Sequence, residues 1–215
     1  MQGHQRERRN GIAERLSSAG LSLQEDAVRK AILTAFAHEG KAPSMEELAH
    51  VLGLPLAAVR AACCTLAAAD LIVWQDEKAH IVSAYPFSGS RTAHAVLLGG
   101  HTTRYAMCAI DALGIPYMLG QGAGIRSACF FCHTLVTVDI AQGLLQGASP
   151  STLVVWLSEQ EGCCVAEVRC PVMNFFCEEA HLQAWHATSP QERGRSLSVL
   201  EALEVGRAAF SALLT

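Results

Sequence analysis

Apolar residues in the first half of the chain recur at helical spacing and are interrupted by residues that end helices. Within residues 25–39 the apolar face is formed by Val28, Ile32, Leu33 and Phe36. Gly40 ends this pattern, and the run from Ser44 to Glu47 has the form of a capping box that opens a second helix. Pro55 is typical of the start of a third helix, which we expect to continue to about residue 69.

Two short strand-like segments follow, at residues 71–74 and 79–82, and a polar turn joins them. Two helices, a turn, a third helix and a hairpin form the outline of a winged helix over residues 25–83. Such a module either binds DNA or has only a structural role. We expect the structural role, because Arg60 is the one basic residue of the third helix, whereas contacts to phosphates and bases need several polar groups.

The second half, residues 104–215, mixes helical and strand-like patterns. We expect helices over about 104–119, 178–188 and 195–213. The expected strands are 125–131, 134–140, 152–158 and 164–170.

The remaining parts of the chain are poor in periodic apolar residues. The polar residues 1–24 predict a loose N-terminal segment, whose first 22 residues form either an irregular lead-in or a frayed helix. Residues 84–103, with Pro86 and several glycines, predict a linker. The sequence therefore predicts an α+β protein, in which an N-terminal winged-helix-like helical module precedes a mixed or antiparallel sheet domain with packed helices.

Composition narrows the class of protein. Hydrophobic residues make up 51% of the chain and charged residues 17%, which favours large buried elements over disorder. The net charge of −4 argues against a protein that binds nucleic acid or anionic membranes through its overall charge. No apolar run reaches the roughly 20 residues of a membrane span, and the polar N-terminus lacks the pattern of a signal peptide. We therefore expect a cytoplasmic location.

Cysteine usage points to chemistry rather than to disulfides. The nine cysteines are at positions 63, 64, 108, 129, 132, 163, 164, 170 and 177. An odd number that includes two adjacent pairs fits a disulfide framework poorly, and in a reducing compartment it indicates metal binding, catalysis or core packing.

Cys108 and Asp111 form the first candidate site. Three residues apart on a helix, their side chains would share one face. A cysteine in an apolar helix commonly only fills the core, but an aspartate among apolar neighbours is costly to bury without a partner and tends to have a raised pKa. Cys170 is the second candidate, on a strand expected to end at Pro171, and it is either a core cysteine or a reactive thiol displayed at a strand end.

Cys129, Cys132 and His133 form a C-x-x-C-H motif. Covalent haem attachment would require export, and a redox dithiol would require a helix N-terminus, and neither is predicted here. A zinc site would need two more ligands. The nearby pair without another role is Cys163-Cys164, but its adjacent spacing makes the zinc signal weak.

Three patches of sequence resemble the alkylmercury lyase (organomercurial lyase) family. The segment from Tyr105 to Leu113 resembles the family's Y-A-x-C-A-x-D-x-L pattern, and Cys129 falls where the family often has a cysteine. A second stretch resembles the family's C-x-x-x-[HN]-F-F-A-S…W pattern. It consists of Cys170, Asn174-Phe175-Phe176, Glu179-Ala180 and Trp185. The likeness covers roughly residues 25–210.

The resemblance implies a lyase that cleaves carbon–mercury bonds by protonolysis, with residues 104–215 as the catalytic domain. Cys108, Asp111 and Cys170 would be the catalytic residues. Cys108 and Cys170 would hold mercury, and Asp111 would be a further candidate ligand. No resident cofactor is implied, and Hg(II) would leave to small thiols or to a mercuric reductase.

Some positions depart from the family pattern. Pro171 stands where some members have a second cysteine, Cys177 where the family usually has alanine, and Cys132 and His133 where many members have threonine and glycine. Two alternatives therefore stay open. One is a soft-metal sensor or chaperone that uses the same cysteines, and the other is a lyase for another carbon–metal or carbon–metalloid bond.

Overall fold

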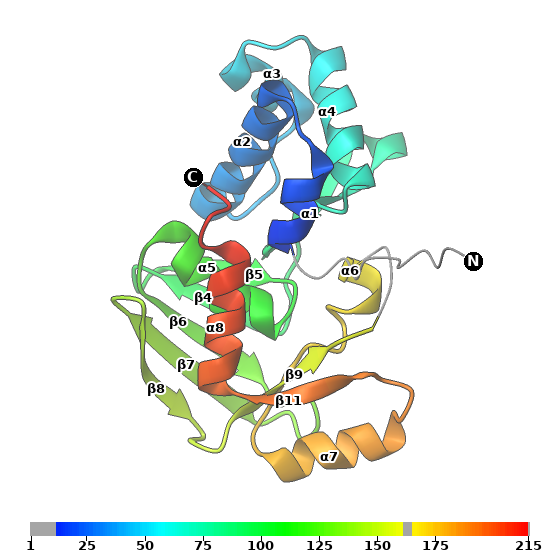
Figure 1. The fold of residues 1–215 in the computed structure, drawn as a ribbon. Coiled ribbons are helices and arrows are strands. Elements are labelled where there is room, and N and C mark those ends of the chain that lie inside the picture. The colour runs from blue at the N-terminus through cyan, green and yellow to red at the C-terminus, as the bar shows by residue number, and fades with distance from the viewer. Residues whose placement is uncertain (1–11, 161–164, 215) are drawn as a thin grey trace, which may run out of the picture.

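The computed structural model describes residues 12–160 and 165–214 (Figure 1). Four helices open the chain: α1 (Ile12–Ala19), α2 (Leu23–Glu39), α3 (Met45–Leu52) and α4 (Leu56–Ala68). Ser22 and Ser44 form capping boxes at the starts of α2 and α3, and Gly40 and Gly53 end these helices in the left-handed conformation. The three helices predicted from residue 25 to residue 69 are confirmed.

An eight-stranded sheet follows, with the strand order β1-β2-β3-β5-β4-β6-β7-β8 and antiparallel pairing between all described neighbours. Its strands are β1 (Ile72–Gln75), β2 (His80–Ala84), β3 (Phe87–Ser88), β4 (His94–Leu98), β5 (Thr102–Ala106), β6 (Ala123–Ala128), β7 (Leu135–Ala141) and β8 (Leu144–Ser149). A short 3-10 helix, η1 (Asp76–Lys78), joins β1 to β2.

A smaller antiparallel sheet has the order β10-β9-β11. Its strands are β9 (Val154–Ser158), β10 (Phe175–Phe176) and β11 (Gly194–Ser198). The helices of this half are α5 (Ala109–Leu119), α6 (Val165–Val168), α7 (Glu179–Thr188) and α8 (Val199–Phe210). Figure 1 shows α5 and α8 in front of the large sheet, with α1–α4 at one end of the molecule and α7 at the other.

Several predictions for the connections and the second half are wrong. Residues 84–103 contain β3 and β4, which lie within the large sheet, so this segment is not a linker. Residues 165–168 form the short helix α6 instead of a strand, β8 was not predicted, and residues 194–198 form β11 ahead of α8. The sequence held local signals for β8 and for the start of α8. Gly143 suits the turn between β7 and β8, where Gln142 and Gly143 have positive φ values, and Ser198 and Glu201 have the spacing of the capping box that they form.

The N-terminal segment also differs in part from the prediction. Residues 12–19, expected to be either loose or a frayed helix, form the helix α1, and Ile12 and Arg15 are buried there. Residues 1–11 lie outside the described part of the chain. Among the described residues, no single helix has the length and apolar character of a membrane span, and α3 and α4 meet these criteria only as a pair bent by 110°.

The packing of α5 against α8 depends on small residues. A Cβ atom added at Gly114 of α5 would lie 2.1 Å from Cδ2 of the buried Phe210 of α8, and one at Gly206 would lie 3.0 Å from the Gly114 nitrogen. These glycines let the two helices approach closely, and α5 carries Asp111 in its first turn.

We expect Gly114→Ala to destabilise the protein by about 1–3 kcal/mol, because the clash with Phe210 outweighs the better helix propensity of alanine. Urea unfolding would measure this change. Gly147→Ala on β8 is the matched control, since an added Cβ there meets no atom within 4 Å. Equal stability of the two variants would contradict the role given to the helix contact.

Candidate functional site

Cys108 lies between β5 and α5, and it is the N-cap of α5 rather than a residue inside a helix. Its backbone is extended, and its Sγ accepts a hydrogen bond from the backbone N–H of Asp111 at 3.4 Å. The prediction that both residues lie on one helix is therefore wrong for Cys108. The two side chains still come together, because an N-cap side chain bends back over the first turn of its helix.

Cys170 follows α6 in a turn, not at the end of a strand as predicted. The turn is held against the start of α5, since the Ala109 N–H donates a hydrogen bond of 2.9 Å to the Met173 carbonyl. Cys170 Sγ then lies 3.7 Å from Asp111 Oδ2. One ligand atom from each of Cys108, Asp111 and Cys170 lies within 4.8 Å of the others, so the structure brings the three predicted residues together.

The three residues are almost completely buried, with Cys108 0%, Asp111 4% and Cys170 3% exposed. Burial raises the pKa of the Asp111 carboxyl to about 7 and the pKa of the Cys108 thiol well above its usual value. The hydrogen bond with Cys108 lowers the pKa of Cys170, but burial and the Asp111 carboxylate outweigh it, so this pKa is also raised. Near neutral pH the site therefore holds protonated thiols beside a carboxyl group that can gain or lose a proton.

Arg15 of α1 is a residue that sequence reasoning missed, because it lies in the segment expected to be loose. Its positive charge lowers the pKa of Asp111 against the effect of burial. The guanidinium lies over the Tyr85 ring, 4.9 Å from the centroid, and its Nη1 is 3.6 Å from Asp70 Oδ2. Arg15 Nε is buried and has no hydrogen-bond partner among the described residues. A buried cation thus acts on the carboxyl group from the N-terminal helix.

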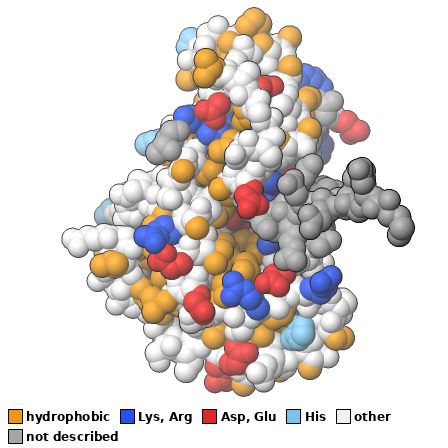
Figure 2. All heavy atoms as spheres, in the orientation of Figure 1, with side chains coloured by type: hydrophobic (Ala, Val, Ile, Leu, Met, Phe, Trp, Pro, Cys, Tyr) orange, Lys and Arg blue, Asp and Glu red, His pale blue; other side chains and the backbone are white. Residues whose placement is uncertain are grey.

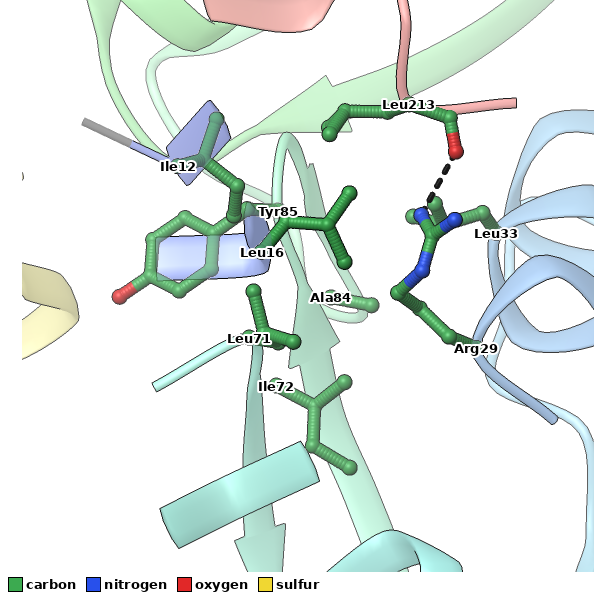
Figure 3. A pocket seen from close by; sticks show the side chains of 9 residues that line it. All are labelled: Ile12, Leu16, Arg29, Leu33, Leu71, Ile72, Ala84, Tyr85 and Leu213. Carbon is green, nitrogen blue, oxygen red and sulfur yellow. Dashed lines mark hydrogen bonds between the residues drawn. The ribbon is translucent and has the colours of Figure 1, made fainter. Parts of the chain in front are cut away.

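A small apolar cavity of about 10 Å³ lies nearby, between α1, α2 and the β1–β2 hairpin (Figure 3). Among the described residues that line it, Arg29 is the charged one, and its Nη1 donates a hydrogen bond of 2.6 Å to the Leu213 carbonyl. The Tyr85 ring borders the cavity and its hydroxyl points away from it (Figure 3). Since this volume holds at most a water molecule, the cavity is a packing gap rather than a substrate site.

Figure 2 shows the outer surface of the face on which α8 lies, in the orientation of Figure 1. Hydrophobic side chains gather in the middle of this face, and acidic and basic side chains surround them.

A second cluster consists of Cys129, Cys132, Cys177 and His181, whose ligand atoms also lie within 4.8 Å of one another. The sequence suggested Cys163 and Cys164 as partners for the C-x-x-C motif, and these two lie outside the described residues. Hydrogen bonds with Thr134 lower the pKa of Cys132 to about 6, whereas burial raises that of Cys177 to about 12. Sequence reasoning did not assign Cys177 and His181 to this cluster. The sequence signal that could have indicated them is their spacing of four residues, which is common for a pair of metal ligands.

Comparisons with known proteins agree with the resemblance seen in the sequence. A family described as alkylmercury lyase matches residues 87–211. An alkylmercury lyase of Staphylococcus epidermidis is 28% identical over 170 residues, which cover 79% of this chain and 75% of that protein. One from Bacillus cereus is 25% identical over 169 residues, covering 78% and 74%. The crystal structure of the mercury-bound form of MerB2 has the same fold, with a TM-score of 0.79, 23% identity and coverage of 93% of this chain and 96% of that one.

We expect Asp111→Asn to make the stability of the protein less dependent on pH. The pKa of Asp111 is raised from 3.8 to about 7, so folding favours the protonated carboxyl group. The stability that this group contributes is complete below its unfolded pKa and is lost as pH rises through the folded pKa, at up to about 1.4 kcal/mol per pH unit. Urea unfolding at about pH 5 and about pH 8 should therefore show a larger loss in the wild type than in the variant.

The matched control is Asp139→Asn, which removes an exposed carboxylate on β7. This variant should retain the pH dependence of the wild type. Equal pH dependence in Asp111→Asn and the wild type would show that Asp111 does not titrate in this range.

Proposed function

The chain belongs to the alkylmercury lyase family, and we propose that it cleaves the carbon–mercury bond of organomercurials by protonolysis, giving a hydrocarbon and Hg(II). The observation that carries this proposal is the meeting of Cys108, Asp111 and Cys170 in one buried cluster. Mercury is a soft metal and prefers thiolates, so two cysteines suit its capture, and a nearby carboxyl group suits the transfer of a proton.

In the proposed reaction, one cysteine thiol replaces the thiolate ligand opposite the organic group on mercury, and its proton leaves with the displaced thiolate as a free thiol. The second thiol then binds mercury as its proton passes to the Asp111 carboxylate. The 3.7 Å between Cys170 Sγ and Asp111 Oδ2 supports such a transfer. Asp111 gives this proton to the carbon, the carbon–mercury bond breaks, and the products are the hydrocarbon and Hg(II) held by Cys108 and Cys170.

The pKa of Asp111 supports its proposed role in both directions of proton transfer. A carboxyl group with a pKa of about 7 can accept a proton from a thiol that metal binding has acidified and can then donate it near neutral pH. Burial also excludes water, which would compete for the proton. Asp111 could also be a weak third ligand of mercury.

The proposed cycle needs no resident cofactor, and it ends when Hg(II) passes to small thiols or to a mercuric reductase. Small thiols are abundant in the reducing cytoplasm, where we propose that the reaction takes place. The same site could act on another carbon–metal or carbon–metalloid bond. A metal sensor or chaperone would use only the cysteines, and the buried carboxyl group beside them favours the lyase.

The helices α2, α3 and α4 and the β1–β2 hairpin are consistent with a winged-helix-like module, and we propose that its role is structural. The β2 strand pairs with β3, so the hairpin continues into the sheet that supports the site. Arg60 is the one basic residue of α4, which disfavours DNA as a partner. The division of the chain into domains at residues 25–83 and 104–215 stays a prediction.

The test of the proposed function is hydrocarbon release from methylmercury or phenylmercury in the presence of excess small thiol. Cys108→Ser and Cys170→Ser should abolish the release of methane or benzene. Asp111→Asn should still bind mercury but lose at least about 100-fold in turnover, because it cannot deliver the proton. Cys64→Ser, at an exposed cysteine of α4, is the control and should match the wild type. Unchanged turnover in Asp111→Asn would refute the acid role.

Arg15→Met should raise the pKa of Asp111 further, because it removes the positive charge that lowers this pKa. In a pH profile of kcat/KM, the limb that reports Asp111 should therefore move to higher pH, whereas Arg15→Lys, which keeps the charge, should shift it less. The measurement uses hydrocarbon release across the pH range. An identical profile for the wild type and Arg15→Met would show that Arg15 does not act on the carboxyl group.

A further inference from the structure

We propose that Cys129, Cys132, Cys177 and His181 form a structural Zn(II) site, separate from the cluster of Cys108, Asp111 and Cys170. The proposal rests on the arrangement of the four side chains and does not depend on the proposed lyase activity. No residue of this second cluster has a part in the reaction described above.

Two distances within the cluster are close to those of a tetrahedral zinc site, and the four ligand atoms lie within 4.8 Å of one another. Cys132 Sγ lies 3.7 Å from Cys177 Sγ, and Cys129 Sγ lies 3.7 Å from His181 Nδ1. Zinc bonds of about 2.3 Å to sulfur and about 2.0–2.1 Å to nitrogen require tetrahedral S···S and S···N separations of about 3.8 and 3.6 Å. Zinc could therefore bind all four ligands with small movements of the side chains.

The first pair of ligands comes from the turn between β6 and β7. Cys129 and Cys132 flank two residues, and hydrogen bonds of 2.8 Å from Cys129 N–H to the Thr134 carbonyl and 2.9 Å from His133 N–H to the Cys129 carbonyl close the turn. His133 follows with a positive φ of 60°. Such a turn directs two sulfur atoms to the same side, as the C-x-x-C half of a zinc site requires.

The second pair comes from the connection between β10 and α7. Cys177 follows β10, and His181 lies in the first turns of α7. The Cys177 N–H points at Cys129 Sγ, 3.4 Å away, and the Thr152 hydroxyl donates a hydrogen bond of 2.7 Å to the Cys177 carbonyl. A backbone N–H directed at a sulfur atom stabilises the thiolate form that binds metal.

The surroundings of His181 suit a metal ligand. Its Nδ1 faces the sulfur atoms, while Nε2 lies 3.5 Å from Glu178 Oε1. A carboxylate on the second ring nitrogen fixes the orientation and the tautomer of a metal-binding histidine. The Phe131 ring packs beside the imidazole, with its centroid 5.2 Å from that of the His181 ring.

The set of ligands favours zinc in a structural role. Thiolates alone would also suit Cu(I) or Hg(II), whereas three thiolates and one imidazole at tetrahedral distances are typical of Zn(II). Four protein ligands leave no open position for a substrate or a reactive water. The site would tie the β6–β7 turn to the chain between β10 and α7. Cys170 lies in the turn that precedes β10.

The first test is the metal content of the full chain purified under reducing conditions with no mercury compound present. We expect about one zinc ion per chain. Cys132→Ala and His181→Ala should lose it, and Cys64→Ser, the exposed cysteine of α4, should retain it. A chelator should lower the Tm of the wild type and of Cys64→Ser but not that of Cys132→Ala.

The second test does not require a variant to fold. After zinc is removed, the wild type should bind Co(II) and show the visible bands of tetrahedral cobalt with thiolate-to-metal charge transfer, and Zn(II) should displace them. Failure to bind either ion would overturn the proposal, as would a binding preference for Hg(II) alone or a resting Cys132–Cys177 disulfide without metal. Because neither test uses an organomercurial, a negative result would refute the zinc site without bearing on the proposed lyase activity.

Discussion

The contact between the start of α5 and the turn after α6 is the constraint on which the functional geometry depends. One hydrogen bond, from Ala109 N–H to the Met173 carbonyl, holds these two segments together and thereby places Cys170 beside Asp111. The same chain segment continues through β10, where the Phe175 carbonyl accepts a hydrogen bond from Phe130, to Cys177 in the second cluster. A single stretch of chain therefore contributes to both groups of cysteines.

The buried carboxyl group of Asp111 is costly for folding and useful for chemistry. An ionised carboxylate without a close partner is disfavoured in the interior, so the protein holds Asp111 with a raised pKa instead. The surrounding structure compensates in two ways. The helix α5 packs closely on α8 at glycine positions, and the positive charge of the buried Arg15 lowers the pKa of Asp111 in part. Stability and reactivity at this site are therefore set by residues that do not touch the substrate in the proposed mechanism.

Local signals in the sequence predicted the helices well, because capping boxes at Ser22 and Ser44 and glycines at helix ends act over a few residues. The closeness of Cys108 and Asp111 was also predictable from their spacing, although Cys108 caps the helix rather than lying within it. The approach of Cys170, Arg15 and the pair Cys177 and His181 was not predictable in this way. Tertiary contacts between distant segments bring these residues to their sites, and the sequence marks some of them, such as Cys170 and the spacing of Cys177 and His181, without showing which residues they meet.

The continuity of the large sheet limits how this protein can be shortened. The family match begins at residue 87, within β3, whereas β1 and β2 pair beyond β3 in the same sheet. A fragment trimmed to the matched region would begin in a strand of two residues and would leave β5 almost unprotected as a sheet edge. An exposed edge offers unpaired backbone groups to other chains, so the hairpin that precedes the matched region, by continuing the sheet beyond β3, moves the sheet edge away from β5.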